Sequence, residues 1–312
     1  MQTGIYRLAA TAIVLLAGTG AVSAAGLGPL VTPAQLASDT AALRPIVLDI
    51  REQGYAEGHL PGAVSAPYST FRGPRDNAGQ VPETGALETA LEGFGLDTAR
   101  PVVIVPDGRS DSDFGAAARV YWTLKSLGFQ DLSILNGGTQ GWIAAGLPVE
   151  TAAITPQPTA LDLTFSDQWS APTTAVTDIV DGKVEAILVD SRPAEFFEGR
   201  TKVDAAARPG TLPGAASHPY TLFFADGSPA ITPQQDTAAL KQLLGVKGDE
   251  DVVAFCNTGH WAATEWFALS ELAGIDNVKL YPGSMVEYSQ AGLPMQNVPG
   301  LLATLKQQIT GN

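Results

Sequence analysis

The chain has 312 residues, a formal net charge of −14 and 45% hydrophobic residues. This length predicts about two domains of ~100–200 residues each. The strong negative charge argues against nucleic acid as a partner, because few basic groups are available to neutralise phosphates. A single cysteine excludes an internal disulfide, so the fold must depend on its hydrophobic core. An anionic ligand would need a local positive site on this acidic protein.

The first residues predict a secretory signal peptide over residues 1–24. Arg7 precedes the segment Leu8–Val22, which is apolar or small throughout, and small residues around Ala24 suit cleavage after it. The alternative is a membrane anchor, but the apolar run is shorter than the roughly 20 residues that a spanning helix needs. We therefore expect a protein secreted across the inner membrane, periplasmic, and without membrane contact after cleavage.

Short motifs occur twice along the chain in the same order. The pairs are PIVLDI (45–50) with AILVD (186–190), HLPGA (59–63) with TLPGA (211–215), PVVIVPD (101–107) with DVVAFC (251–256), LSILNGG (132–138) with VKLYPG (278–283), and AAGLP (144–148) with QAGLP (290–294). So many landmarks in one order indicate a tandem duplication.

Helical patterns separate the apolar, strand-like runs. The predicted helices are 35–43, 87–94, 114–127 and 142–145 in the first copy, and 177–181, 237–244, 262–272 and 285–290 in the second, with a final helix at 298–309. Alternating strands and helices predict an α/β fold in which each copy is a mainly parallel sheet flanked by helices on both faces. We assign residues 25–150 to the first domain, 151–172 to a linker and 173–312 to the second domain.

The one cysteine lies where a predicted strand meets a predicted helix. Cys256 ends the run 251–256, and Asn257–Trp261 form a short loop before the helix. In parallel α/β sheets ligands bind at this edge, and the unpaired amides of a helix start favour negative charge. We therefore expect Cys256 to be a nucleophilic thiolate, with Gly259 allowing the loop to curl. The alternative is a small buried hydrophobic residue that ends a strand.

These features together resemble a two-domain rhodanese, a member of the thiosulfate/3-mercaptopyruvate sulfurtransferase family. The resemblance rests on the doubled D-x-R motif, the H-x-P-G-A turn, a cysteine loop only in the second half, and the closing AGLP. It implies two rhodanese domains of which the first is inactive. It also implies that Cys256 takes a sulfane sulfur from thiosulfate or 3-mercaptopyruvate, forms a persulfide, and passes the sulfur to cyanide, a thiol or a protein acceptor.

The resemblance also implies roles for neighbouring residues. Arg192 matches the family's substrate-contacting arginine, with Asp190 supporting it; the alternative is a structural ion pair of Arg192 with Asp190 or Glu195. A guanidinium suits an oxyanion because its donors form a fixed fork. The persulfide and the donor would be held by the loop residues Asn257, Thr258, Gly259, His260 and Trp261. We expect no cofactor and no metal, because three histidines and one cysteine show no ligand spacing.

The loop departs from the family's pattern, because it lacks the basic residues or the hydroxyl that family members often carry there. His260 is the only possible cation of this loop. We expect it to supply a charge or a hydrogen bond, and the alternative is an exposed imidazole without a role. Trp261 either excludes water and selects a larger acceptor, or packs between the domains.

Other polar residues are interpreted as structural. His59 is expected to be a structural or surface histidine, and His218 either shapes the pocket or has no role in it. Asp107, Arg109 and Asp111 either line the entrance to the site or belong to a solvated loop.

Four other functions of a lone cysteine are alternatives to sulfur transfer. A cysteine phosphatase needs an arginine six residues after the cysteine, but position 262 is alanine. A papain-like protease needs an orienting histidine and asparagine, for which no signature is present. A periplasmic persulfide carrier with little small-molecule turnover is the alternative that the neutral loop favours. A redox-sensing thiol would form a stable sulfenic acid without a sulfur donor.

Overall fold

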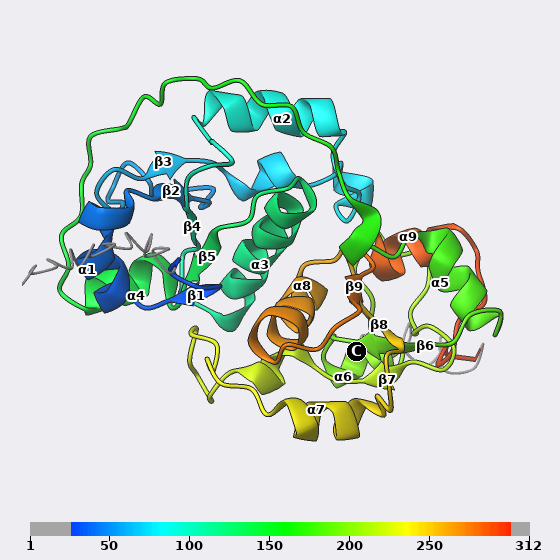
Figure 1. The fold of residues 1–312 in the computed structure, drawn as a ribbon. Helices are drawn as coiled ribbons and strands as arrows, with labels where there is room; N and C mark the ends of the chain where they lie inside the picture. The colour runs from blue at the N-terminus through cyan, green and yellow to red at the C-terminus, as the bar shows by residue number, and fades with distance from the viewer. Residues whose placement is uncertain (1–25, 301–312) are drawn as a thin grey trace, which may run out of the picture.

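The structure is a computed structural model that describes residues 26–300 (Figure 1). The predicted signal peptide and most of the predicted helix at 298–309 lie outside the described residues, and both stay predictions. Within residues 26–300, every helix is too short or too polar to cross a membrane.

The first half of the chain folds around a parallel five-stranded sheet with the order β1-β5-β4-β2-β3. Its strands are β1 (Leu30–Val31), β2 (Ile46–Asp49), β3 (Val64–Ser65), β4 (Val102–Val105) and β5 (Leu132–Leu135). Its helices are α1 (Pro33–Leu43), α2 (Thr84–Gly93), α3 (Asp111–Ser126) and α4 (Gly138–Ala144), with short 3-10 turns η1 (Tyr68–Phe71) and η2 (Arg75–Asn77). Alternate strand residues pack against α2 and α3 on one face and against α1 and α4 on the other, as in a sheet buried on both faces.

The second half repeats this design in a parallel sheet with the order β7-β6-β8-β9. Its strands are β6 (Ala186–Asp190), β7 (Ala216–Ser217), β8 (Asp251–Phe255) and β9 (Val278–Leu280). Its helices are α5 (Thr173–Val180), α6 (Ala194–Phe197), α7 (Thr237–Leu244), α8 (Trp261–Phe267), which continues as a π-helix (Ala268–Leu272), and α9 (Ser284–Gln290); its 3-10 turns are η3 (Asp167–Trp169) and η4 (Tyr220–Phe223). A single parallel bridge from Ser170 to Leu280 stands where β1 pairs with β5 in the first half. The predicted duplication is therefore confirmed at the level of topology.

The two halves share one hydrophobic core at the contact of α3 with α8. Phe114 of α3 meets Phe267 of α8 edge to face, with ring centroids 5.4 Å apart, and Tyr121 meets the same ring at 5.0 Å. Lys125 of α3 forms an ion pair of 2.7 Å with Glu271 beside this contact. Because aromatic packing of this kind fixes geometry as well as burying area, the first half has a defined position over the second.

The connecting segment 151–172 lies along the first half as an extended strip, as Figure 1 shows beside α2. The amides of Leu161 and Leu163 donate hydrogen bonds to the carboxylates of Glu92 (2.9 Å) and Glu88 (2.7 Å) on α2. The predicted linker is thus hydrogen-bonded to the first half, and it contains one 3-10 turn.

The eight helices predicted before residue 298 and the six predicted strands are present among the described residues, with boundaries shifted by a few residues. The two-residue strands β1, β3 and β7 were not predicted, because a run of two residues has no readable periodicity.

Candidate active site

Cys256 follows β8 directly and is buried, with 1% of its surface exposed. Its amide donates a hydrogen bond of 3.0 Å to the hydroxyl of Ser284 at the start of α9, and its carbonyl accepts one of 3.1 Å from the amide of Met285. We call residues 256–261 the cysteine loop. The amides of Asn257, Thr258 and His260 in this loop have no acceptor among the described residues. These donors remain free for an anion beside the sulfur.

Gly259 occupies the position in the loop that only glycine suits. Its φ is +66°, and a β-carbon there would lie 2.6 Å from the carbonyl oxygen of Pro282 and 2.3 Å from Nη1 of Arg119. Its own amide donates to Ser284 Oγ at 3.1 Å. The predicted need for a positive φ is confirmed, and the crowding adds a second reason for glycine.

Arg192 lies in an ion pair with Asp190, the alternative that the sequence left open for it. Its Nε and Nη2 donate to the two carboxylate oxygens at 2.8 and 2.6 Å, and Nη2 also donates to the carbonyl of Gly210 at 2.8 Å. Nη1 donates to Oδ1 of Asn257 at 3.3 Å. With 2% of its surface exposed, the guanidinium supports the cysteine loop from behind and does not face a donor.

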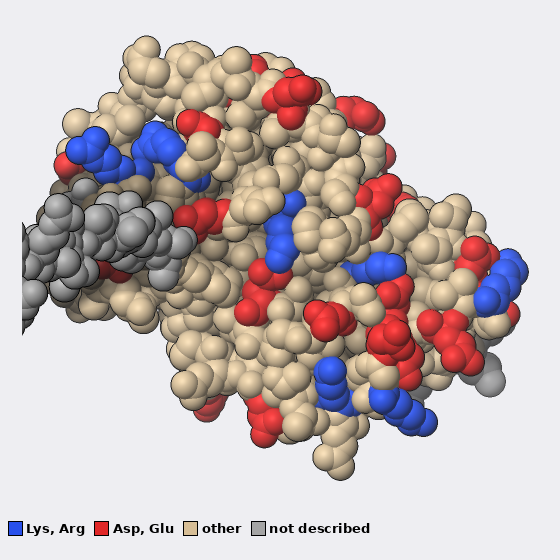
Figure 2. All heavy atoms as spheres, in the orientation of Figure 1, with Lys and Arg blue, Asp and Glu red and all other residues tan. Residues whose placement is uncertain are grey.

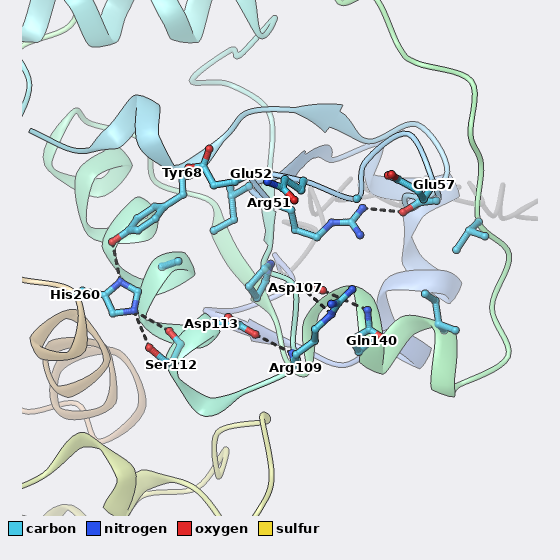
Figure 3. Close-up of a pocket in the computed structure, with 18 residues that line it drawn as sticks. Arg51, Glu52, Glu57, Tyr68, Asp107, Arg109, Ser112, Asp113, Gln140 and His260 are labelled. Carbon is cyan, nitrogen blue, oxygen red and sulfur yellow. Dashed lines mark hydrogen bonds and ion pairs between the residues drawn. The ribbon is translucent and has the colours of Figure 1, made fainter. Parts of the chain in front are cut away.

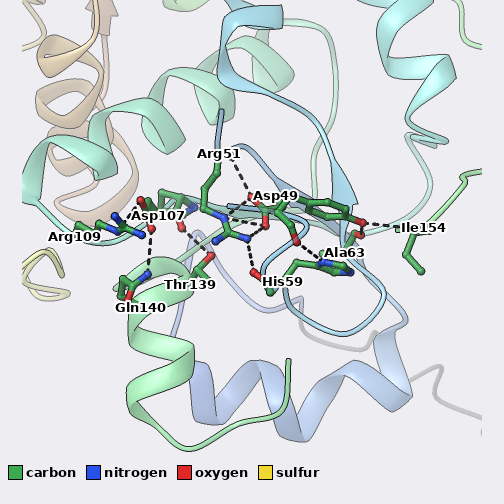
Figure 4. Close-up of polar contacts among 12 residues, drawn as sticks. Asp49, Arg51, His59, Ala63, Asp107, Arg109, Thr139, Gln140 and Ile154 are labelled. Atoms are coloured by element: carbon green, nitrogen blue, oxygen red, sulfur yellow. Dashed lines mark hydrogen bonds and ion pairs between the residues drawn. The ribbon is translucent and has the colours of Figure 1, made fainter. Parts of the chain in front are cut away.

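The first half contains the same arrangement without a cysteine (Figure 4). Arg51 donates through Nε and Nη2 to Asp49 at 2.9 and 2.5 Å, and its Nη2 reaches the carbonyl of Gly58 at 2.7 Å. Both arginines thus make the same contacts with an aspartate and a glycine carbonyl, which indicates a structural role for the motif in each half. Only Arg192 adds a contact with the cysteine loop, through Asn257.

His260 bridges the cysteine loop to the first half (Figure 3). Its Nδ1 lies 2.9 Å from the hydroxyl of Tyr68, and its Nε2 lies 2.9 Å from the carbonyl oxygen of Ser112 and 3.1 Å from its hydroxyl. Removal from solvent, together with the nearby charge of Arg72, lowers the pKa of His260 to about 4. His260 is therefore neutral near pH 7. Both ring nitrogens therefore contact the first half, and a role of His260 toward the persulfide or the donor stays a prediction.

Trp261 packs on two aromatic rings of the second half and contacts the first half through its indole N–H, and its role toward an acceptor stays a prediction. Its ring stacks on that of Tyr220, with centroids 5.2 Å apart and an interplanar angle of 9°, and the ring of Phe196 meets it edge-on. Its Nε1 donates to the hydroxyl of Ser112 at 3.0 Å. His260 and Trp261 thus both reach the same serine at the start of α3.

Two arginines of the first half contact the cysteine loop, and neither was predicted from the sequence. Arg72, directly after η1, donates from Nη2 to the hydroxyl of Thr258 at 2.9 Å. Arg119 on α3 is fully buried; its Nη1 donates to the carbonyl of Gly259 at 3.3 Å and its Nη2 to the carbonyl of Gly79 at 2.8 Å. An arginine among the apolar residues of the predicted helix 114–127 was a usable signal for Arg119. Arg72 carries no such signal.

The remaining polar candidates have structural partners. His59 stacks on Tyr55 with ring centroids 3.9 Å apart, as its structural interpretation predicts (Figure 4). His218 lies 2.8 Å from the buried carboxylate of Glu265, on the helix that follows the cysteine loop. Asp111 accepts a hydrogen bond of 3.2 Å from the hydroxyl of Tyr220.

A cavity of about 780 Å³ lies at the carboxyl edge of the first sheet and does not include Cys256 (Figure 3). Asp107 and Arg109 line it and pair with each other at 3.1 Å, while Tyr68, Ser112 and His260 form the wall toward the cysteine loop. The cavity therefore occupies, in the first half, the edge at which the second half carries its thiol.

In the described part of the chain, no three His, Cys, Asp or Glu residues lie close enough together to hold a metal ion. The charged side chains on the face shown in Figure 2 are mainly acidic, with the basic ones in a few small groups. The two arginines beside the cysteine loop bring local positive charge to a chain whose net charge is negative.

The comparison with protein families matches the model described as "Rhodanese-like domain" twice, over residues 32–145 and 173–291. A 3-mercaptopyruvate sulfurtransferase of Escherichia coli is 30% identical over 79% of this chain and 86% of its own length. A putative thiosulfate sulfurtransferase of Synechococcus elongatus is 28% identical over 81% and 80%.

Solved structures agree on the fold. The crystal structure of the Tum1 protein of Saccharomyces cerevisiae superimposes with a TM-score of 0.71 at 18% identity, covering 88% of this chain and 99% of that one. The structure of the 3-mercaptopyruvate sulfurtransferase SseA of Escherichia coli gives a TM-score of 0.68 at 24% identity, covering 82% and 98%. With two matched domains, two parallel sheets and one cysteine loop, the chain belongs to the rhodanese-like domain family and is a two-domain sulfurtransferase.

Proposed function

We propose that the protein transfers a sulfane sulfur from thiosulfate or 3-mercaptopyruvate, through a persulfide on Cys256, to cyanide or a thiol. The observation that carries the proposal is the cysteine loop itself, in which a buried thiol is followed by three amides without acceptors. Several unpaired amide donors close in sequence to a thiolate can stabilise an anionic sulfur without a mobile ion.

The first step is a displacement at sulfur. The Cys256 thiolate attacks the outer sulfur of thiosulfate, a new S–S bond forms, and the original S–S bond breaks with its electron pair leaving on sulfite. With 3-mercaptopyruvate a C–S bond breaks instead, and the carbon takes up the thiol proton to give pyruvate. In the second step cyanide or a thiolate attacks the outer sulfur of the persulfide, and the electron pair of the broken S–S bond returns to Cys256.

The burial of Cys256 favours small substrates over a carrier role. A carrier must present its persulfide to a second protein, whereas 1% of the Cys256 surface is exposed. Enclosure also strengthens electrostatic interactions with the transferred sulfur, because little water screens them. The predicted export of the protein stays a separate proposal, to be tested by its location in fractionated cells.

The proposal is tested by following sulfite release from thiosulfate with cyanide as acceptor, and the mass of the intact protein after exposure to each donor. We expect turnover that Cys256→Ser abolishes, and a mass increase of one sulfur atom on the peptide that contains Cys256. Persulfide loading without turnover would support the carrier instead. A wild-type protein that takes up no sulfur from either donor would remove the proposed function.

A further inference from the structure

We infer that the first half, although it has no cysteine, supplies the positive charge of the active site: Arg72 binds the anionic sulfur donor, and Arg119 stabilises the anionic sulfur of Cys256. This inference rests on the proposed function and assigns donor binding to a residue outside the second half.

Arg119 is a buried cation without a carboxylate partner in the described part of the chain. It is fully buried on α3, and the groups it contacts are the carbonyls of Gly79 and Gly259 and the ring of Trp122, 4.9 Å from the guanidinium. Burying a charge is costly unless an opposite charge compensates it. A thiolate or persulfide at Cys256, three residues from Gly259 in the same loop, is the anion placed to do so.

The electrostatics around Arg119 agree with this geometry. Burial and the neighbouring Arg72 lower the pKa of Arg119 to about 9, while Tyr68 and Cys256 act in the opposite direction. Cys256 thus lies within electrostatic range of the guanidinium, which would attract a negative charge on its sulfur. Without Arg119, Arg72 would be the remaining guanidinium in contact with the loop from the first half.

Arg72 has a free donor at the same loop. Its Nη2 holds the hydroxyl of Thr258, its guanidinium lies 5.2 Å from the ring centre of Tyr68, and its Nη1 is buried with no hydrogen-bond partner among the described residues. Buried donors are normally paired, so an unpaired one next to a catalytic loop indicates a ligand that completes it. A guanidinium fork suits the sulfonate oxygens of thiosulfate or the carboxylate of 3-mercaptopyruvate.

The other two residues that were predicted to offer positive charge to the donor, Arg192 and His260, lack a free hydrogen-bond donor or a charge. The donors of Arg192 are taken by Asp190, Gly210 and Asn257, and His260 is neutral near pH 7. An anionic donor approaching this acidic protein therefore finds its positive partner in the first half.

The test for Arg72 compares Arg72→Ala, Arg72→Lys and the control Arg75→Ala, which removes an exposed arginine three residues away. A charge-assisted hydrogen bond of this kind is worth about 10- to 100-fold, so we expect Arg72→Ala to lower kcat/KM for thiosulfate by that factor, mainly through KM. Arg72→Lys should be intermediate, Arg75→Ala unchanged, and methylguanidinium should rescue Arg72→Ala.

Three outcomes separate the possibilities. Unchanged kcat/KM in Arg72→Ala would overturn the inference while leaving the proposed function in place. A loss that methylguanidinium does not rescue and that accompanies a lower Tm would assign Arg72 to structure and would also overturn it. Absence of any wild-type turnover would instead remove the proposed function.

Arg119 is tested through the thiolate itself, because Cys256 is the only cysteine and its ultraviolet thiolate absorbance can be isolated by subtracting Cys256→Ser. Arg119→Met, of similar length but uncharged, should show less thiolate than the wild type near neutral pH. Arg119→Lys keeps the charge and should retain more, which guards against a variant that merely folds poorly. Equal thiolate absorbance in all three folded proteins would overturn the role given to Arg119.

Discussion

The hydroxyl of Ser284 accepts hydrogen bonds from the amides of Cys256 at 3.0 Å and Gly259 at 3.1 Å. Ser284 therefore links two residues of the cysteine loop to the start of α9. The serine is fully buried and has a φ of +50°, a conformation that costs free energy in any residue other than glycine. The equivalent residue of the first half is Gly138, with a φ of +57°. In the second half a serine thus occupies a strained backbone position, and its hydroxyl binds the amide of the cysteine.

Replacing this hydroxyl should weaken the loop. We expect Ser284→Ala to lower the free energy of unfolding by about 1–3 kcal/mol, because two buried amides lose their acceptor, and to lower turnover as well. Ser284→Gly loses the same hydroxyl but relieves the positive φ, so it should be less destabilised than Ser284→Ala. Urea unfolding and steady-state kinetics measure both effects. Wild-type turnover in Ser284→Ala would contradict this role.

A methyl group at Gly259 should disrupt the loop beyond the cost of its φ. Gly274→Ala is the matched control, because Gly274 has a φ of +63° and open space where a β-carbon would lie. The control should lose about 1–2 kcal/mol of stability, the usual cost of a left-handed residue, and keep its turnover. Gly259→Ala meets Pro282 and Arg119 in addition, so it should lose more stability and at least about 10-fold in kcat/KM. If Gly259→Ala and Gly274→Ala had similar free energies of unfolding and similar kcat/KM, the contacts of the added methyl group with Pro282 and Arg119 would have no effect.

The two D-x-R arginines should be equally important for folding and unequally important for activity. Breaking a buried ion pair costs about 3–5 kcal/mol, so Arg51→Gln and Arg192→Gln should each lower the free energy of unfolding by that order. Arg192→Gln also removes the contact with Asn257, and it should lower turnover under conditions where both variants are folded. A wild-type rate in Arg192→Gln, or a large kinetic defect in Arg51→Gln, would contradict this division.

The stability contributed by His260 should depend on pH. Its pKa is about 4 in the folded protein and 6.5 as the ordinary value, so below pH 6.5 the unfolded chain binds a proton that the folded chain does not. The free energy of unfolding should therefore fall as the pH falls from about 6.5 toward about 4. His260→Gln lacks this contribution, so its stability should fall less over the same window in urea unfolding. Parallel pH profiles for the two proteins would show that His260 titrates normally.

The sequence by itself determined the architecture and the position of the lone cysteine. Apolar runs such as 186–190 and 251–255 are typical of buried parallel strands, and their repetition in order revealed the duplication. The same local reading placed Cys256 at the carboxyl edge of the second sheet, because the end of a strand and the start of a helix are both visible within a few residues.

Only the tertiary structure decided which groups surround that thiol. The contacts of Arg72 with Thr258 and of His260 with Tyr68 join residues 186 and 192 positions apart, and that of Arg119 with Gly259 joins residues 140 apart. No local pattern carries such information, since it depends on how the first half packs over the second. For the same reason the sequence left the roles of Arg192 and His260 open: whether a basic side chain faces a ligand, pairs with a carboxylate or loses its proton is set by the burial and partners that packing provides.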